Sequence, residues 1–198
     1  MSDVSSKPAS QIAKWFVQNF DLTNDFCDQV KLQKLLFFSW LIHKSKFDES
    51  LFDDMFYAFE NGPVVKTIYP YLCYDSLFSS FKDEPLDETK FSENEKETLN
   101  TAYEIFHKMD WEELVEISHE SPAWIKFYND SLIFEDGVFK GYHSEKAQIP
   151  KEELKTELQM IENVLYVYEN LEEFGYNADG SVENESESVE GEKQDGSG

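Results

Sequence analysis

Leu35-Leu36-Phe37-Phe38-Ser39-Trp40-Leu41-Ile42, at residues 35–42, is the longest apolar stretch of the chain, and it decides the fold. Only Ser39 interrupts it. The stretch belongs to a long helix that we expect to begin after the polar break at residues 21–24. A helix that is apolar on all sides lies in the interior of a protein, so we expect a central buried helix here. It is far shorter than the ~20 residues that a membrane-spanning helix needs.

Helical periodicity and capping motifs predict further helices around the central one. Apolar residues recur at helical spacing after Pro8, which suits an opening helical position. Residues 92–95 (Ser-Glu-Asn-Glu) and 110–113 (Asp-Trp-Glu-Glu) have the pattern of capping boxes, in which two residues satisfy each other's free backbone amides. The last helix is expected to begin at Pro150. Several amphipathic helices should therefore surround residues 35–42.

Strand signals are few and short. Residues 55–60 are aromatic-rich and run into the tight turn at residues 61–63, so we expect a strand there, followed by a helix that Pro63 starts. Asp-Gly at residues 136–137, between two apolar runs, predicts a hairpin. The charged residues 79–91 are expected to form a loop. The fold class predicted is mainly α: a compact domain of about six helices with one or two short strands or hairpins.

Charge excludes two classes of partner. The 198 residues include 41 acids and 17 basic residues, a formal net charge of −24, and every basic residue is Lys. Binding to a phosphate backbone requires clustered cations and favours the arginine fork. Anionic membranes would be repelled in the same way. We therefore expect no nucleic acid and no membrane among the partners.

The C-terminal end differs in composition from the rest. Beyond Tyr176 the sequence consists mainly of Asn, Ala, Gly, Ser, Glu and Lys, with almost no apolar residues. Such a segment cannot bury enough apolar surface to fold. We expect one domain at residues 1–175 and a disordered acidic tail at residues 176–198.

Cysteine usage and the N-terminal sequence bear on the compartment. Cys27 and Cys73 lie in apolar surroundings without the ligand spacing of zinc sites, so we expect two buried free thiols. Met1-Ser2-Asp3 does not begin a secretory signal, and the expected location is the cytoplasm. Glycine-rich nucleotide loops and the common hydrolase motifs are absent from the sequence. These features predict no cofactor, no metal and no enzymatic activity.

A few polar or aromatic residues allow two interpretations. Gln33 and Lys34 either point outward or contact the turn at residues 61–62. Trp124 fits an exposed interface anchor or a core residue, and the core is favoured. His119 is interpreted mainly as a hydrogen-bonded structural residue, and its place at a helix end would suit a protonated ring.

Three stretches together resemble the Panacea domain, also described as SocA-like or GepA-like. Lys31-Leu32-Gln33-Lys34-Leu35-Leu36-Phe37-Phe38 is similar to the KLQKLLYY helix of that family. Phe59-Glu60-Asn61-Gly62-Pro63-Val64 is similar to its W-x-x-GPV turn. Leu114-Val115-Glu116-Ile117-Ser118-His119, with Pro122 and Trp124, is similar to its L-x-x-x-[ST]-H segment and the following PW. The resemblance covers roughly residues 9–172. Phe59 in place of Trp, and Ala123 between Pro122 and Trp124, depart from the pattern and blur the ligand surface.

The resemblance implies an antitoxin of bacterial or phage origin. Members of this family neutralise a toxin by direct protein contact, the toxin is usually encoded by a neighbouring gene, and some members are thought to deliver the partner to a protease. No catalytic residues are implied. The residues that this places at the binding site are Gln33, Lys34, Asn61, Gly62, Pro63, Val64, His119 and Trp124.

The function predicted is that of an antitoxin-like module in a toxin–antitoxin pair. A toxin surface that acts on nucleic acid is often cationic, so an acidic chain predicts a basic toxin as partner. One alternative is a DNA mimic that inhibits a DNA-binding enzyme by charge alone. A second is a metal-dependent enzyme with an acid-lined site at Asp53, Asp54 and Glu60.

Overall fold

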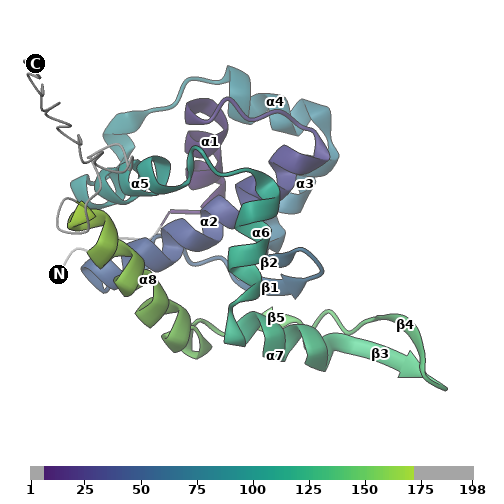
Figure 1. Cartoon of the computed structure of the whole chain (residues 1–198). Helices are drawn as coiled ribbons and strands as arrows, with labels where there is room; N and C mark the ends of the chain where they lie inside the picture. Colours follow the sequence, from purple (N-terminus) through teal and green to yellow (C-terminus); the bar gives the residue numbers. More distant parts are fainter. Residues whose placement is uncertain (1–6, 172–198) are drawn as a thin grey trace, which may run out of the picture. The chain divides into compact units, whose positions relative to one another are not determined.

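The computed structural model describes residues 7–171, which form eight α-helices and five short strands (Figure 1). The chain divides into two compact units, Met1–Leu165 and Tyr166–Gly198. All sites discussed below lie in the first unit. In the described part of the second, the Asn170 side chain donates a hydrogen bond to the Tyr166 carbonyl at 2.7 Å. The acidic tail predicted at residues 176–198 lies outside the described residues.

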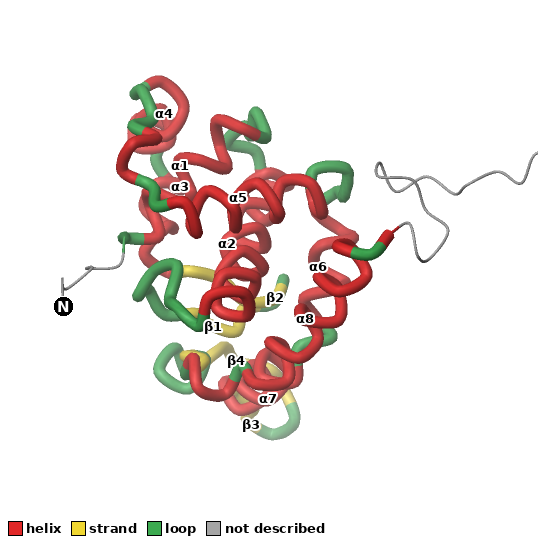
Figure 2. Tube along the Cα trace, turned by 90° about the vertical axis from the view of Figure 1, so that its left-hand side faces the viewer, coloured by secondary structure: helices red, strands yellow, loops and turns green. Residues whose placement is uncertain are grey.

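Helix α2 (Phe26–Phe47) is the centre of the first unit. Its middle is buried on all sides, with Leu35, Leu36 and Phe37 at most 1% exposed. Asp25 caps the N-terminus, and Asp48 ends the helix in a left-handed conformation with φ 54°. Figure 2 shows α2 running between α5 and the β1–β2 hairpin. The prediction of a central buried helix is confirmed.

The remaining helices pack around α2 and one another. They are α1 (Ala9–Asn19), α3 (Tyr69–Cys73), α4 (Asp75–Asp83), α5 (Glu93–Phe106), α6 (Trp111–His119), α7 (Pro122–Ser131) and α8 (Lys155–Glu169), with short 3-10 turns at Lys66–Ile68, Glu88–Lys90 and Lys151–Glu153. Both predicted capping boxes are present, at the N-termini of α5 and α6. The mainly α fold class is confirmed.

Part of the loop predicted at residues 79–91 is helical. Helix α4 continues to Asp83, because Phe78 and Phe81 lie on one face and are buried, 6% and 3% exposed. Phe81 also stacks on Tyr71 of α3, with ring centroids 4.5 Å apart. The loop was predicted from the charged residues of this segment, which lie on the outer face of the helix and do not reveal the apolar inner face.

Three strands form a small antiparallel sheet in the order β2-β1-β5. They are β1 (Phe56–Phe59), β2 (Gly62–Val65) and β5 (Gln148–Ile149). In the β1–β2 register Phe59 pairs with Gly62 and Ala58 with Pro63. The helix predicted to start at Pro63 is therefore wrong. Pro63 is accommodated because β2 is an edge strand, where the missing backbone N–H breaks no central ladder.

The second hairpin joins β3 (Leu132–Glu135) to β4 (Val138–Tyr142) and is separate from the first sheet. Its turn residues Asp136 and Gly137 both have positive φ, 52° and 76°. This is the conformation that Asp-Gly favours in two-residue hairpin turns. The hairpin predicted at residues 136–137 is confirmed.

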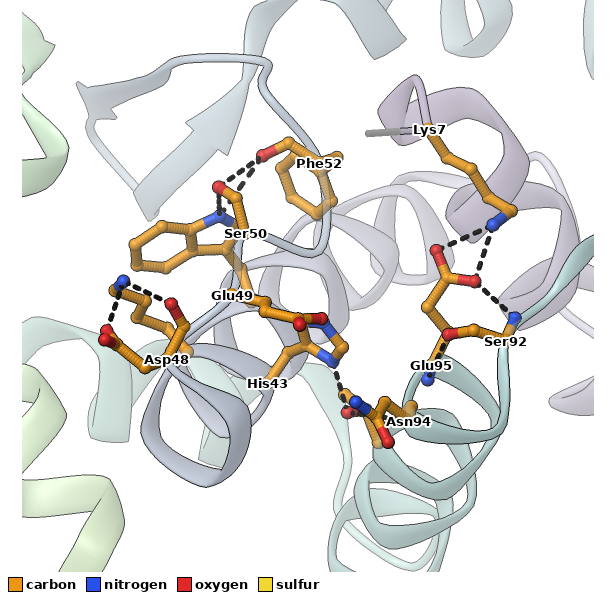
Figure 3. A network of polar contacts seen from close by, with 12 residues as sticks. Lys7, His43, Asp48, Glu49, Ser50, Phe52, Ser92, Asn94 and Glu95 are labelled. Carbon is orange, nitrogen blue, oxygen red and sulfur yellow. Dashed lines mark hydrogen bonds and ion pairs between the residues drawn. The ribbon is translucent and has the colours of Figure 1, made fainter. Parts of the chain in front are cut away.

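A polar network ties the N-terminal segment and α2 to α5 (Figure 3). Lys7 forms an ion pair with Glu95, the residue of α5 that completes the capping box with Ser92. His43 Nδ1 lies 2.7 Å from Thr98 Oγ1, and that hydroxyl donates its hydrogen to the Asn94 carbonyl. Nδ1 must therefore carry the proton of a neutral His43 ring, and burial lowers the pKa of His43.

The two cysteines lie at the protein surface. Cys27 and Cys73 are both free but exposed, so the prediction of buried thiols is wrong. Each lies at an end of its helix beside an exposed aromatic residue, Phe26 next to Cys27 and Tyr74 next to Cys73, so these apolar neighbours do not mark the core. No helix within residues 7–171 has the length and apolar character needed to cross a bilayer.

Replacement of Phe56 by Ala should strongly destabilise the fold. Phe56 is 0% exposed and its ring contacts those of Phe37, Trp40 and Phe52 at centroid distances of 5.3, 5.8 and 5.8 Å. We expect a loss of about 3–5 kcal/mol in the free energy of unfolding, measured by urea denaturation. The matched control is Phe134→Ala, because Phe134 is 57% exposed and its removal should cost less than about 1 kcal/mol. Equal losses in the two variants would contradict this account of the core.

Candidate functional site

The turn between β1 and β2 brings the three family-like stretches together. It lies against α2 on one side and against the α6–α7 corner on another. We use the name turn cluster for the residues that meet there: Gln33, Lys34, Asn61, Gly62, Pro63, Val64, Ser118, His119 and Trp124. All eight binding residues predicted from sequence belong to it, and Ser118 is added by the structure.

Gln33 and Lys34 hold the free edge of β2. Gln33 Oε1 accepts a hydrogen bond from the Val65 amide at 2.7 Å, and Gln33 Nε2 donates to the Val65 carbonyl at 3.3 Å. Lys34 Nζ donates to the Pro63 carbonyl at 2.8 Å. Both side chains are buried, 4% and 0% exposed. Of the two interpretations left open by the sequence, the contact with the hairpin is the one observed.

Lys34 is a buried cationic residue without an acidic partner. Its described contacts within residues 7–171 include no ion pair, and its hydrogen bond goes to a neutral carbonyl. Burial lowers the pKa of Lys34 well below its ordinary value of 10.5. Desolvation penalises the ammonium form, and a carbonyl compensates for only part of that penalty. The amine is therefore a structural donor whose charge is costly to keep.

Gly62 permits the close approach of α2, α6 and the turn. Its φ is +94°, in the region that L side chains rarely adopt. A Cβ at this position would lie 2.7 Å from Lys34 Nζ and would overlap Ser118 Oγ. Neither neighbour moves freely, because Lys34 Nζ donates a hydrogen bond to the Pro63 carbonyl and Ser118 Oγ donates one to the Val115 carbonyl at 2.9 Å.

His119 and Trp124 hold the other side of the turn. His119 Nε2 lies 3.2 Å from the Glu60 carbonyl, and Trp124 Nε1 donates to the Phe59 carbonyl at 2.8 Å. Their rings stack with centroids 4.1 Å apart and planes 9° from parallel. Burial is the largest cause that lowers the pKa of His119, and the bond to Glu60 partly opposes it. Trp124 is 9% exposed and is therefore a core residue, not an exposed interface anchor.

A buried carboxylate fixes the helix that carries Trp124. Glu157 of α8 accepts hydrogen bonds from Ser121 Oγ at 2.6 Å and from the Ala123 amide at 2.9 Å. An acid at a helix N-terminus satisfies free amides and interacts favourably with the helix dipole. Ser121 in turn caps α7 through the Trp124 amide. Helix α7 was not predicted, and the bonds from Glu157, more than thirty positions later, depend on tertiary packing.

A pocket of about 420 Å³ opens beside the turn cluster. Its walls come from α2, the β1–β2 hairpin, α3 and the segment around the end of β4. Gln33, Lys34, Asn61 and Val64 line it, whereas the four other predicted residues do not. Tyr69 and Tyr142 also line it and were not predicted, since nothing in the sequence relates these two segments to α2.

The acidic residues Asp53, Asp54 and Glu60 do not act together. Asp54 accepts hydrogen bonds from the Ala9 amide at 2.8 Å and from Thr67 Oγ1 at 2.5 Å. It therefore caps the first turn of α1 and anchors the segment after β2. No three His, Cys, Asp or Glu side chains are grouped to hold a metal ion in the part of the chain that the structure describes.

Part of the chain matches a known protein family. The family model described as "Antitoxin SocA-like, Panacea domain" matches residues 32–125, a range that contains every residue of the turn cluster. The resemblance predicted from the three stretches is confirmed. No curated protein and no solved structure matches the chain.

Gly62→Ala should destabilise the protein far more than the same change at Gly137. Both glycines have positive φ, +94° and +76°, but only Gly62 has neighbours within contact distance of an added Cβ. We expect at least about 2 kcal/mol at Gly62, because crowding adds to backbone strain, and about 1 kcal/mol at Gly137 from strain alone. Urea denaturation of the two variants measures the difference. Similar losses would show that crowding at the turn cluster is unimportant.

Lys34→Met should change how stability depends on pH. In the wild type the folded state has a lowered pKa for Lys34, so between that pKa and 10.5 the unfolded chain binds more protons. The Lys34 contribution is fully present above 10.5 and is lost as the pH falls through the folded pKa. Raising the pH toward 10 should stabilise the wild type relative to the variant by up to about 1.4 kcal/mol per pH unit. Urea denaturation at pH 7 and pH 9.5 tests this, and a constant difference would contradict it.

Proposed function

We propose that this chain is an antitoxin-type protein-binding module that neutralises a partner toxin by direct contact. The family match over residues 32–125 supports an antitoxin role in general. Neutralisation by direct contact is supported by the meeting of three stretches, far apart in sequence, at the β1–β2 turn. A turn that hydrogen bonds hold in place loses little conformational freedom on binding, which suits it to recognising a protein partner.

Four polar side chains of the turn cluster are already engaged with the backbone of the chain itself. Gln33, Lys34, His119 and Trp124 each bond a main-chain group of the β1–β2 hairpin. A general base or nucleophile needs a reactive atom directed at a substrate. The arrangement is instead that of a scaffold, which favours binding over chemistry.

Charge supports a basic partner. The chain carries a formal net charge of −24 and contains no Arg. Opposite charge accelerates association and selects partners, while a standard interface of about 1,600 Å² supplies affinity. We place the partner among basic toxins encoded by a neighbouring gene, and delivery of that toxin to a protease is a second mode of neutralisation to be tested alongside blocking. The same charge favours the DNA-mimic alternative, in which shape matters little.

The variant Asn61→Arg distinguishes an antitoxin that recognises its partner by shape from a DNA mimic that acts by charge alone. Asn61 is half-buried at the turn and lines the pocket, so a long cationic side chain there alters the shape of the site. The chain is co-expressed with the product of the neighbouring gene, and the growth of the cells is measured. Binding between the two proteins is measured separately at 50 and 500 mM NaCl. We expect wild-type rescue, binding that persists at high salt, and a loss of at least about tenfold in affinity for Asn61→Arg.

The matched control is Ser79→Arg, which adds the same charge at an exposed position of α4 and should behave as wild type. Binding that disappears at 500 mM NaCl and is equally weakened by both variants would indicate a charge-only DNA mimic. Absence of rescue by the wild-type chain would contradict the antitoxin role. Measuring the level of the toxin distinguishes blocking, in which it is unchanged, from delivery to a protease, in which it falls.

A further inference from the structure

A continuous series of aromatic rings leads from the turn cluster to the β3–β4 hairpin. We call it the aromatic ladder; it consists of His119, Trp124, Tyr128, Tyr142, Phe139 and Phe134. Successive ring centroids are 4.1, 5.1, 5.8, 5.0 and 5.9 Å apart. Apart from the parallel stack of His119 on Trp124, these separations lie in the range of about 4.5–7 Å that aromatic pairs prefer.

The ladder is buried at one end and exposed at the other. Trp124 is 9% exposed, whereas Tyr142, Phe139 and Phe134 are 44%, 47% and 57% exposed. In Figure 1 the hairpin that carries these three rings extends beyond the C-terminal end of α7. Grouped aromatic rings left in water mark a binding surface more often than a defect.

The hairpin is fixed to the body of the first unit, so its rings are presented in a defined place. The His143 amide donates to the Ser131 carbonyl at 2.7 Å, and the Tyr128 and Tyr142 hydroxyls lie 3.3 Å apart. That hydroxyl contact is the largest cause that raises the pKa of Tyr128 to about 12, and the phenol stays neutral. Tyr142 also lines the pocket, which makes the ladder continuous with the concave part of the site.

Two kinds of occupant have to be compared, a second copy of this chain and a basic protein. A second copy brings the same −24 charge to the interface and is repelled. The charges beside the ladder favour a cationic occupant: on the hairpin the exposed acids Glu135 and Asp136 outnumber the exposed Lys140, and Glu60 adds to the negative potential at Tyr128. Charge therefore selects the basic protein.

The ring faces of the ladder are not used by the chain's own cations. The cation–π contacts present in residues 7–171 place lysines over rings elsewhere, namely Phe20, Trp40, Phe52, Tyr57, Phe91 and Phe127. The chain has no Arg that would stack there. A planar guanidinium stacks on an aromatic face and simultaneously binds a carboxylate through paired hydrogen bonds, which an ammonium does not do.

We propose that the aromatic ladder is the docking surface for an arginine-bearing segment of the basic partner. The proposal rests on the proposed function and names the surface and the chemistry by which the toxin is held. Arginine side chains lie on the faces of Phe134, Phe139 and Tyr142, and the neighbouring carboxylates bind the guanidinium edges. The turn cluster supports this surface from within.

The test is a titration of ¹⁵N-labelled full-length protein with hexa-arginine and, at equal concentration and 150 mM NaCl, with hexa-lysine. We expect amide shifts concentrated at residues 119–143 and affinity about three- to tenfold higher for hexa-arginine. Phe139→Ala and, separately, Phe134→Ala should each weaken hexa-arginine binding about threefold or more. Tyr74→Ala is the matched control, because Tyr74 is 62% exposed and lies between α3 and α4, outside the ladder.

Equal binding of the two peptides, shifts located elsewhere, or binding unchanged in both Phe variants would overturn the proposal. The same variants are then assayed for neutralisation of the neighbouring gene product. If they lose hexa-arginine binding but neutralise as wild type does, the ladder is not the toxin surface, while the proposed function stands. If the wild-type chain fails to neutralise, the proposed function falls, and the peptide titration still decides whether the ladder binds arginine.

Discussion

The hydrogen bonds of Gln33 and Lys34 to strand β2 are the constraint on which the site depends. These two polar side chains lie in the buried middle of α2, next to Leu35, Leu36 and Phe37. A buried amide or amine without a partner costs several kcal/mol, which is a large share of the stability of a domain. The edge of β2 supplies the partners, so the β1–β2 hairpin has to lie against α2. Once it does, the carbonyls of Phe59 and Glu60 face α6 and α7 and bind Trp124 and His119.

Lys34 shows why this arrangement is specific as well as stable. A methionine would fill the same volume at a lower desolvation cost, and replacing buried charged groups by apolar ones is often neutral or stabilising. What an apolar residue cannot do is bind the Pro63 carbonyl, a group on an edge strand that has no strand neighbour on that side. Lys34 therefore trades stability for a defined position of the turn. Gly62 is the geometric complement, because any side chain there would displace the amine or Ser118.

Local sequence signals predicted the parts of the fold that local forces determine. The central helix, both capping boxes and the Asp-Gly hairpin follow from periodicity and backbone chemistry within a few residues. The errors lie where tertiary partners decide. Pro63 suits a helix start or an edge strand, and only pairing with Ala58 selects the strand. The Ala123 amide at the start of α7 is satisfied by Glu157 of α8, and Cys73 is exposed although its neighbours in sequence are apolar. The convergence of the site residues came from the resemblance of three stretches, whereas their individual bonds required the structure.

The site thus separates into an inner frame and an outer surface. The frame residues bond the chain's own backbone, and all of them lie within residues 32–125, the range that the antitoxin family model matches. The most exposed rings of the ladder lie beyond that range, on a hairpin whose attachment uses different hydrogen bonds. Changes at residues 134–139 therefore alter what the surface presents without touching the pocket that Gln33, Lys34 and Tyr142 line. A module built in this way can acquire a new partner through its hairpin while the buried hydrogen bonds that fix the fold stay the same.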